Sequence, residues 1–336
     1  MPQRAKQILF LLAAALCAAP WPTPHMGAIA LAAGIILALF NLTAWPAETK
    51  TLSRWLLQAC IVALGLRLDI SQLAHAALDG LTLAIATIFG ALALGLLLGK
   101  LLGVGRDLSL LISSGTAICG GSAIASVGSA IRAKSADMAM ATAVIFTLNA
   151  VGVFLLPSIG HALNMSDHAF GTWAGVAIHD MASVSAVAKG YHADSTLTSA
   201  ALDQANVVKL TRVLWIIPIT LAAAWWAARR DRQQATRDGS TIAPAQAKMQ
   251  WPWFILLFLL ASIIRTLIPS LASASDEIKL ITSCGFQLAL FLIGAAVSKA
   301  ALKSMGWRAL TQAVTLWLAL ATATAFVLNS THTATP

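Results

Sequence analysis

Residues 81–98 read LTLAIATIFGALALGLLL and contain no charged side chain. Similar uncharged runs recur at 29–40, 138–156 and 253–264, and across all 336 residues 58% are hydrophobic and 10% are charged. With its flanks, each run approaches the ~20 residues that a membrane-crossing helix needs. Backbone groups cannot stay unpaired in hydrocarbon, and these runs lack the alternation of a membrane β-barrel. The sequence therefore predicts an all-α polytopic membrane protein.

Hydropathy predicts about nine to eleven transmembrane segments. The candidates are 8–20, 26–45, 55–70, 80–101, 108–131, 138–160, 170–189, 206–228, 251–270, 280–298 and 308–328. The most basic loop, 229–248, is expected in the cytoplasm together with the N-terminus, because positively charged loops stay on that side. We expect a multi-pass protein of the bacterial inner membrane with a single transport domain. It would comprise a first part (1–228) with both polar segments, a basic cytoplasmic linker (229–250) and C-terminal helices (251–328).

The charge and the cysteines restrict the function. Lys and Arg give a formal charge of +9 but are scattered over short loops, so we expect no nucleic-acid partner. The four cysteines fall in apolar segments without metal-site spacing, which predicts free thiols, no metal and no cofactor. The chain has no GxSxG, HExxH, Walker A or GxGxxG motif, so it is not expected to be an enzyme. The expected partners are the bilayer and a small inorganic or organic anion; a homo-oligomer is left open.

One segment interrupts the apolar pattern with small residues: 113–129 read SSGTAICGGSAIASVGS. Each glycine weakens a helix by ~1 kcal/mol relative to alanine, so we expect a broken helix whose freed N–H groups bind an oxyanion. The alternative is close packing of helices through small residues. The predicted substrate-binding residues of this segment are Gly115, Thr116, Cys119, Gly120, Gly121 and Ser122.

A second unusual segment, 175–186, reads GVAIHDMASVSA. Ionisable residues at membrane depth cost ~2.5–3.5 kcal/mol on insertion scales unless they face a cavity or a partner. Histidine is the side chain that titrates nearest physiological pH, so His179 and Asp180 are predicted to couple or gate transport. A purely structural hydrogen bond between them is the alternative. Ser183 is predicted to contact the substrate.

Three further polar residues lie in predicted membrane segments. Lys209 and Arg212 are three positions apart on one helix face and are predicted to supply positive charge to an anion path. The alternative for both is that the side chain extends to the lipid headgroups. Asn149 is predicted to line the site, with a bridge between helices as the alternative.

Two weak internal sequence similarities suggest a repeat. Gly115 and Gly175 each begin a Gly-x-Ala-Ile pattern, and residues 63–85 resemble 293–315. Loop charges give the second pair opposite orientations, which predicts two inverted repeats. We therefore expect 108–131 and 170–189 to be broken or re-entrant, to enter from opposite sides, and to bring 120–122 close to 179–183.

These motifs resemble those of the YeiH-like sulfate exporter family of bacterial membrane proteins. The resemblance is carried by SGTAICGGSAIAS at 114–126, WAGVAIHD at 173–180 and VVKLTRVLWIIP at 207–218. It implies a secondary active transporter that exports a small sulfur-containing oxyanion such as sulfate, sulfite or a sulfonate. The family usually continues Ile-His-Asp with threonine and a polar residue, where this chain has Met181 and Ala182. That departure bears on the choice of substrate.

Residues and resemblance together predict export coupled to a proton or sodium gradient, since the chain has no nucleotide motif. A passive anion channel is the alternative. An intramembrane enzyme that uses Cys119 with His179 is a third interpretation.

Overall fold

The computed structural model describes residues 3–21, 25–79, 81–191, 198–238, 253–297 and 305–332, and in these ranges the chain is helical with no β-strand. The helices are α1 (Gln3–Ala18), α2 (Met26–Leu39), α3 (Pro46–Gly65), α4 (Ile70–Asp79), α5 (Leu81–Leu101), α6 (Arg106–Ala117), α7 (Gly121–Ala130), α8 (Ser135–Ala162), α9 (Asp167–Ala177), α10 (Met181–Tyr191), α11 (Thr198–Leu214), α12 (Ile216–Asp238), α13 (Trp253–Leu267), the 3-10 helix η1 (Pro269–Ala272), α14 (Ser275–Ala295) and α16 (Trp307–His332).

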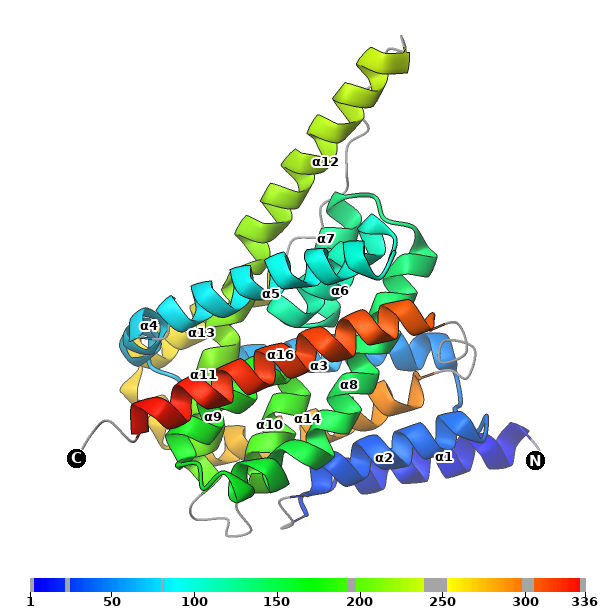
Figure 1. Ribbon diagram of the computed structural model, residues 1–336. Coiled ribbons are helices and arrows are strands. Elements are labelled where there is room, and N and C mark those ends of the chain that lie inside the picture. The colour runs from blue at the N-terminus through cyan, green and yellow to red at the C-terminus, as the bar shows by residue number, and fades with distance from the viewer. Residues whose placement is uncertain are drawn as a thin grey trace.

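The described helices confirm the all-α membrane class. Among the described residues, five stretches are long and apolar enough to cross a bilayer: Leu81–Leu101, Ser135–Ala162, Ala200–Gln233, Ser275–Ala295 and Trp307–Ser330. Met26–Leu39 and Trp253–Leu267 are apolar but shorter. The five are fewer than the nine to eleven that hydropathy suggests, partly because 108–131 and 170–189 each form two short helices. The first part of the expected basic linker is helical, since α12 extends to Asp238 and projects from the body (Figure 1). Residues 239–250 lie outside the described ranges.

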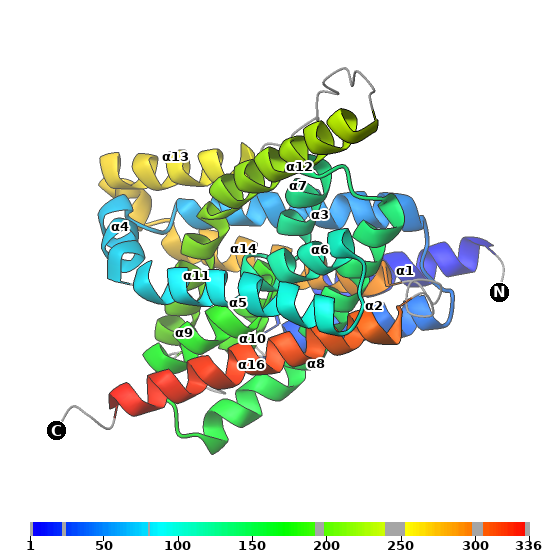
Figure 2. The same cartoon turned by 45° about the horizontal axis from the view of Figure 1, so that its top comes forward.

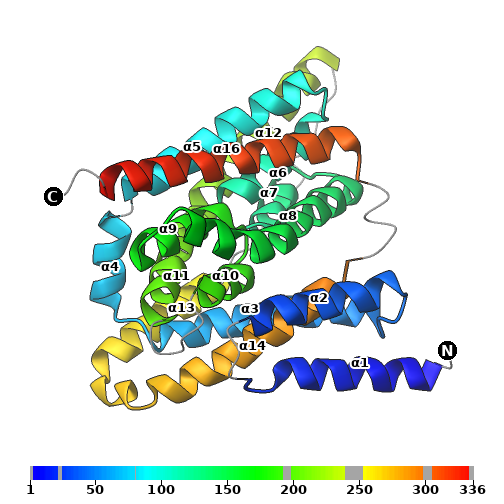
Figure 3. The same cartoon turned by 60° about the horizontal axis from the view of Figure 1, so that its bottom comes forward.

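Helices α1, α2, α3, α13 and α14 lie together along one side of the molecule, and we call them the wall (Figure 3). Helix α14 packs against α1, α2 and α3. Its contact with α2 is reciprocal: a Cβ on Gly34 would lie 2.1 Å from the Phe291 carbonyl oxygen, and one on Gly294 would lie 2.4 Å from the Leu31 oxygen. The two backbones therefore touch, which is how small residues stabilise helix pairs in lipid.

Helices α6 and α7 form a helical hairpin, which we call hairpin 1. Side-chain carbons of Ile124 lie 3.1 Å from the position of a Cβ on Gly115. In one continuous helix these residues, nine positions apart, would be separated by about 13 Å along the axis. The chain reverses at 118–120, where Gly120 has φ +60° and ψ −117°, a conformation that side-chain-bearing residues rarely adopt. The glycine therefore permits the turn.

Helices α9 and α10 form hairpin 2. Ser166 caps the start of α9 by accepting a hydrogen bond from the Ala169 N–H at 3.3 Å, which stabilises the helix at that end. The end of α10 lies next to the start of α9. Tyr191, in the last turn of α10, donates to the Met165 oxygen at 2.5 Å, and its ring stacks on Phe170 at 3.7 Å between centroids. The turn at 178–180 is thus the closed end of the hairpin.

The two hairpins point toward each other. Helix α16 runs past both, beside α5 and on the side away from the wall (Figures 2 and 3). Gln312 donates to Ser109 Oγ in the first turn of α6 at 2.9 Å, and Trp317 donates to the carbonyl oxygen of Ala177, at the end of α9, at 2.8 Å. Further along, the Ala321 oxygen accepts from the Trp173 indole at 2.8 Å. The base of hairpin 1 and the base of hairpin 2 therefore lie at opposite ends of α16, with both turns between them.

This geometry confirms the prediction that 108–131 and 170–189 are broken, and both reverse direction. The prediction that the flanking helices form inverted repeats stays a prediction.

Candidate functional site

The turns of the two hairpins are in contact. A Cβ on Gly120 would lie 3.3 Å from the Cβ of His179 and 3.2 Å from Ile145. The sequence predicted this meeting of the glycine cluster with the Ile-His-Asp segment. Both Gly120 and His179 are buried.

Lys209, from α11, joins the two turns. Its ammonium donates to the carbonyl oxygen of Ile178 in hairpin 2, and to that of Ile118 in hairpin 1 at 3.3 Å. The side chain is 0% exposed. A cation here compensates the partial negative charge that the aligned carbonyls create at the C-terminal ends of α6 and α9. Lys209 thus holds the turns together electrostatically.

Arg212 lies one turn further along α11 and is also 0% exposed. Its Nη2 donates to the carbonyl oxygens of Ala117 at 2.5 Å and Thr116 at 3.3 Å, and its Nη1 donates to Thr87 Oγ1 at 3.0 Å. Burial and inward hydrogen bonds exclude the lipid-headgroup alternative for both cations. Thr87 was not among the predicted site residues, because a threonine in an apolar helix commonly bonds its own backbone, as Thr87 also does to Leu83.

Asn149, from α8, organises the second turn. Its Oδ1 accepts from the His179 backbone N–H at 2.9 Å and lies 2.7 Å from Nδ1 of the same residue. Its Nδ2 donates to Asp180. Because the amide donates to the carboxylate, its oxygen faces the imidazole, and Nδ1 must carry a proton. In the neutral ring Nε2 is then the free acceptor.

Asp180 is the N-cap of α10. Its Oδ1 accepts from the Ser183 N–H at 2.9 Å, and its Oδ2 accepts from the Ser183 hydroxyl at 2.6 Å. With Asn149 as a third donor, the carboxylate is well supplied with hydrogen bonds. The predicted alternative, a direct hydrogen bond between His179 and Asp180, is not what the structure has. Asn149 hydrogen-bonds both residues instead.

The start of α7 differs from the start of α10. Its N-cap is Gly120, which has no side chain to accept a hydrogen bond, and the neighbouring Cys119 sulfur is hydrogen-bonded to the Ala123 N–H and to the Ser122 side chain. The N–H groups of 121 and 122 precede the first backbone hydrogen bond of α7, which Ile124 donates to Gly120, and therefore lack an intrahelical partner. Two buried polar atoms of the hairpins, His179 Nε2 and Thr116 Oγ1, have no hydrogen-bond partner within the described ranges. The contact of Gly120 with His179 brings the start of α7 next to this histidine.

Not every predicted residue contributes a polar group to this place. Gly115 lies inside hairpin 1 against Ile124, so the packing alternative applies to it. Cys119 is a buried free thiol. A Cβ on Gly121 would lie 3.3 Å from the Phe146 ring, and Gly121 and Ser122 are the partly exposed residues of the turn.

The fold and the site define a polytopic helical membrane protein with two opposed hairpins and buried cations at their junction. Residues 5–313 match the family described as Conserved hypothetical protein 698, and the chain belongs to that family. Relatives called UPF0324 membrane proteins cover almost the whole chain. One from Geobacter sulfurreducens is 38% identical over 320 residues, with 95% of each chain covered. One from Vibrio parahaemolyticus is 38% identical over 317 residues, with 94% of this chain and 96% of the relative covered.

A third relative, from Bacteroides thetaiotaomicron, is 38% identical over 309 residues, covering 90% of this chain and 86% of the relative. No solved structure matches the chain. The comparisons therefore give the family and the membrane class.

Proposed function

We propose that this protein is a secondary active transporter of the bacterial inner membrane that exports a small sulfur-containing oxyanion, coupled to a proton or sodium gradient. It would act without a cofactor and without enzymatic turnover. The observation that carries the proposal is the glycine N-cap of α7, which lies against His179 beside two buried cations.

An oxyanion fits the start of α7 for the same reason that Asp180 fits the start of α10. There a carboxylate accepts hydrogen bonds from the first turn of the helix. At α7 the glycine provides no such group, so the N–H groups of 121 and 122 remain as donors, while the Ala123 N–H and the Ser122 side chain are hydrogen-bonded to the Cys119 sulfur. Helix N-termini bind anions through unpaired N–H groups and a partial positive charge. A bound oxyanion would thus supply the cap that the sequence omits.

The charges at the junction favour an anion over a cation. Lys209 and Arg212 carry two fixed positive charges, against one carboxylate, Asp180, that its own hydrogen bonds occupy. Buried cations with polar surroundings are expected to attract an anion strongly where the dielectric constant is low. The sulfur chemistry itself rests on the resemblance of the motifs at 114–126, 173–180 and 207–218 to the YeiH-like exporters.

His179 offers a way to couple a proton to the anion. Its Nδ1 is engaged by Asn149, so a proton that arrives binds Nε2 and creates a new N–H donor. A proton at Nε2 and an anion beside it stabilise each other, and by linkage each raises the affinity for the other.

The orientation follows from the basic residues at one end. Asp107, at the base of hairpin 1, pairs with Arg230 of α12 at 3.3 Å, and Arg132, just after α7, pairs with Asp231. Positive-inside topology favours the cytoplasm for this end and for the N-terminus. Hairpin 1 would then enter from the cytoplasm and hairpin 2 from the outside.

The test is transport by purified protein in liposomes. Labelled sulfate, sulfite and methanesulfonate would be followed under imposed pH and sodium gradients. Saturable flux that one gradient drives uphill supports the proposal. Electrogenic flux that neither saturates nor responds to a gradient would favour the passive channel, and absence of flux for all three anions would refute the substrate class.

A further inference from the structure

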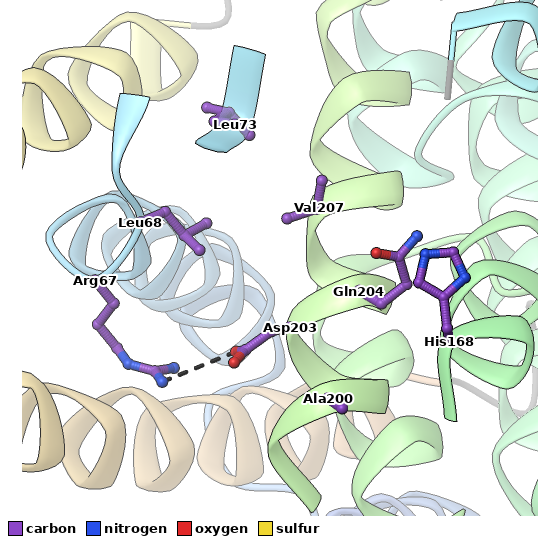
Figure 4. Close-up of a pocket in the computed structure, with 8 residues that line it drawn as sticks. All are labelled: Arg67, Leu68, Leu73, His168, Ala200, Asp203, Gln204 and Val207. Carbon is purple, nitrogen blue, oxygen red and sulfur yellow. Dashed lines mark ion pairs between the residues drawn. The ribbon is translucent and has the colours of Figure 1, made fainter. Parts of the chain in front are cut away.

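A cavity of about 330 Å³ opens at the base of hairpin 2, between the end of α3, α4, α9 and α11. Arg67, His168, Ala200, Asp203 and Gln204 are among the residues that line it (Figure 4). Its volume far exceeds the ~30 Å³ that one water occupies in the liquid. It lies away from the turns, because Asp203 precedes Lys209 on α11 by about 9 Å of helix.

The cavity contains an ion pair whose charged atoms are unusually far apart. Arg67 and Asp203 point toward each other with 3.8 Å between Nη2 and Oδ1 (Figure 4). A charge-assisted hydrogen bond is normally 2.7–2.9 Å. The Arg67 side chain is 12% exposed and that of Asp203 is 42% exposed. Within the described part of the chain, Nε of Arg67 is buried without a hydrogen-bond partner. The guanidinium is therefore only partly satisfied.

Basic side chains gather near the cavity. Lys279, on α14, interacts electrostatically with Asp203 and with Lys189, at the end of α10, and Arg67 also interacts with Lys189. Asp203 is the only carboxylate among the cavity-lining residues that the structure describes. Arg67 and Lys279 thus both act on this carboxylate, and Lys189, which donates to Ser283, lies close to both cations.

Basic side chains are unusual at this place. On the orientation proposed above, the base of hairpin 2 faces the outside, where loops of membrane proteins are poor in Lys and Arg. The cavity is also tied to the transport site: Gln204 donates to Thr172 of α9 at 2.9 Å, and α11 continues from Asp203 to Lys209 and Arg212. The positive-inside rule therefore does not explain the basic side chains near this cavity.

We propose that the cavity is an outer binding site for a free oxyanion, in which Asp203 is a built-in competitor that an arriving oxyanion displaces from Arg67. This inference rests on the proposed function for its orientation and for the class of its ligand. The oxyanion would accept from Arg67, with Lys189 and Lys279 providing the surrounding positive potential. In an exporter it is the last binding place before release.

The test uses a thiol placed inside the cavity. Ala200 is exposed and lines it, so Ala200→Cys in a Cys284→Ser background gives a local reporter in the full-length protein. Its reaction rates with anionic sulfonatoethyl methanethiosulfonate and with the cationic trimethylammonium analogue would be measured in detergent. Sodium sulfate would be added against sodium chloride of equal ionic strength.

We expect the anionic reagent to react about fivefold faster than the cationic one, since one unit charge a few ångströms away changes a local concentration by that order even in water. Sulfate should slow the reaction at least fivefold. Arg67→Gln should abolish this protection, whereas Asp203→Asn should lower the sulfate concentration needed for it. Arg265→Gln, an arginine on α13 that does not line the cavity, should leave protection unchanged.

Opposite effects of the two variants separate a binding site from a structural ion pair. If Arg67→Gln and Asp203→Asn weaken protection alike, or if sulfate gives none, the inference is wrong. It is also wrong if phosphatidylglycerol in mixed micelles protects and sulfate does not, because the site would then hold a lipid headgroup.

The two proposals can fail separately. Intact protection without transport in liposomes would overturn the proposed function and support the cavity site. Saturable transport without sulfate protection at Ala200→Cys would overturn the cavity site and support the proposed function.

Discussion

Asn149 Oδ1 lies 2.7 Å from His179 Nδ1 and accepts the His179 backbone N–H at 2.9 Å. One amide oxygen thus fixes both the backbone and the ring of the same residue. The relationship assigns the proton of the neutral imidazole to Nδ1 and leaves Nε2 for exchange.

Asn149→Ala should lower transport at least tenfold with a small change in fold, because His179 and Asp180 both lose a partner. A lost buried hydrogen bond of this kind typically costs about 1–3 kcal/mol. Initial rates in liposomes and the melting temperature would be compared. Thr147→Ala on the same helix removes a hydroxyl that bonds only its own helix, at Ala143, and should transport like the parent protein. Equal losses in the two variants would contradict the role of Asn149.

His179→Gln should flatten the pH profile of transport, because the proposed coupling depends on protonation of the imidazole. The glutamine retains a polar end but exchanges no proton. Anion binding should persist at reduced affinity. The matched control is His161→Gln, since His161 stacks on Tyr191 at 4.4 Å, far from the turns in the fold. A profile that keeps its shape in His179→Gln would leave this histidine a structural residue.

Lys209→Gln should fold but bind sulfate about tenfold more weakly. Glutamine can still donate to the Ile178 carbonyl, while the fixed charge that attracts the anion is gone. Lys209→Met should in addition lower the melting temperature, because the carbonyls of Ile118 and Ile178 lose their donor. Equilibrium binding and thermal unfolding separate the two effects. Unchanged affinity in a folded Lys209→Gln variant would remove Lys209 from the anion site.

Gly120→Ala should destabilise the protein by about 1–3 kcal/mol, the usual cost of a side chain in a sparsely populated backbone conformation. The new methyl group would also press on Ile145 and His179. Gly90→Ala is the contrast, since a Cβ there meets nothing within 4 Å and replaces a helix-interior glycine, so it should be neutral or stabilising by up to ~1 kcal/mol. Thermal unfolding of both variants measures the difference, and similar melting temperatures would show that the turn tolerates a side chain.

The sequence indicated the helical membrane class because uncharged runs of sufficient length have few other stable forms. It also located both breaks, although for different reasons. At Gly120 the break follows from a residue that tolerates positive φ. At Ile178 there is no glycine; the signal was the pair of ionisable residues next to it, which required partners at membrane depth.

The partners themselves could not be predicted. Thr87 and Arg212 are 125 positions apart, and Asn149 and His179 are 30 apart, so their contacts depend on how whole helices pack. The sequence supported two roles for Asn149 and two for Lys209. Only the packing of α8 and α11 against the turns decided between a lipid-facing and a buried lysine.

Helix α16 is hydrogen-bonded to both hairpins, which restricts how they can move relative to each other. Gln312 and Trp317 of α16 bond the base of hairpin 1 and the closed end of hairpin 2, respectively. The two donor residues are five positions apart on one rigid helix, so the helix fixes the spacing between the two hairpins. We therefore expect α16 and both hairpins to travel as one rigid body against the wall. A spin-label pair reporting the distance between the turns would then give one value in both transport states, whereas a pair reporting the distance from a turn to α2 would give two.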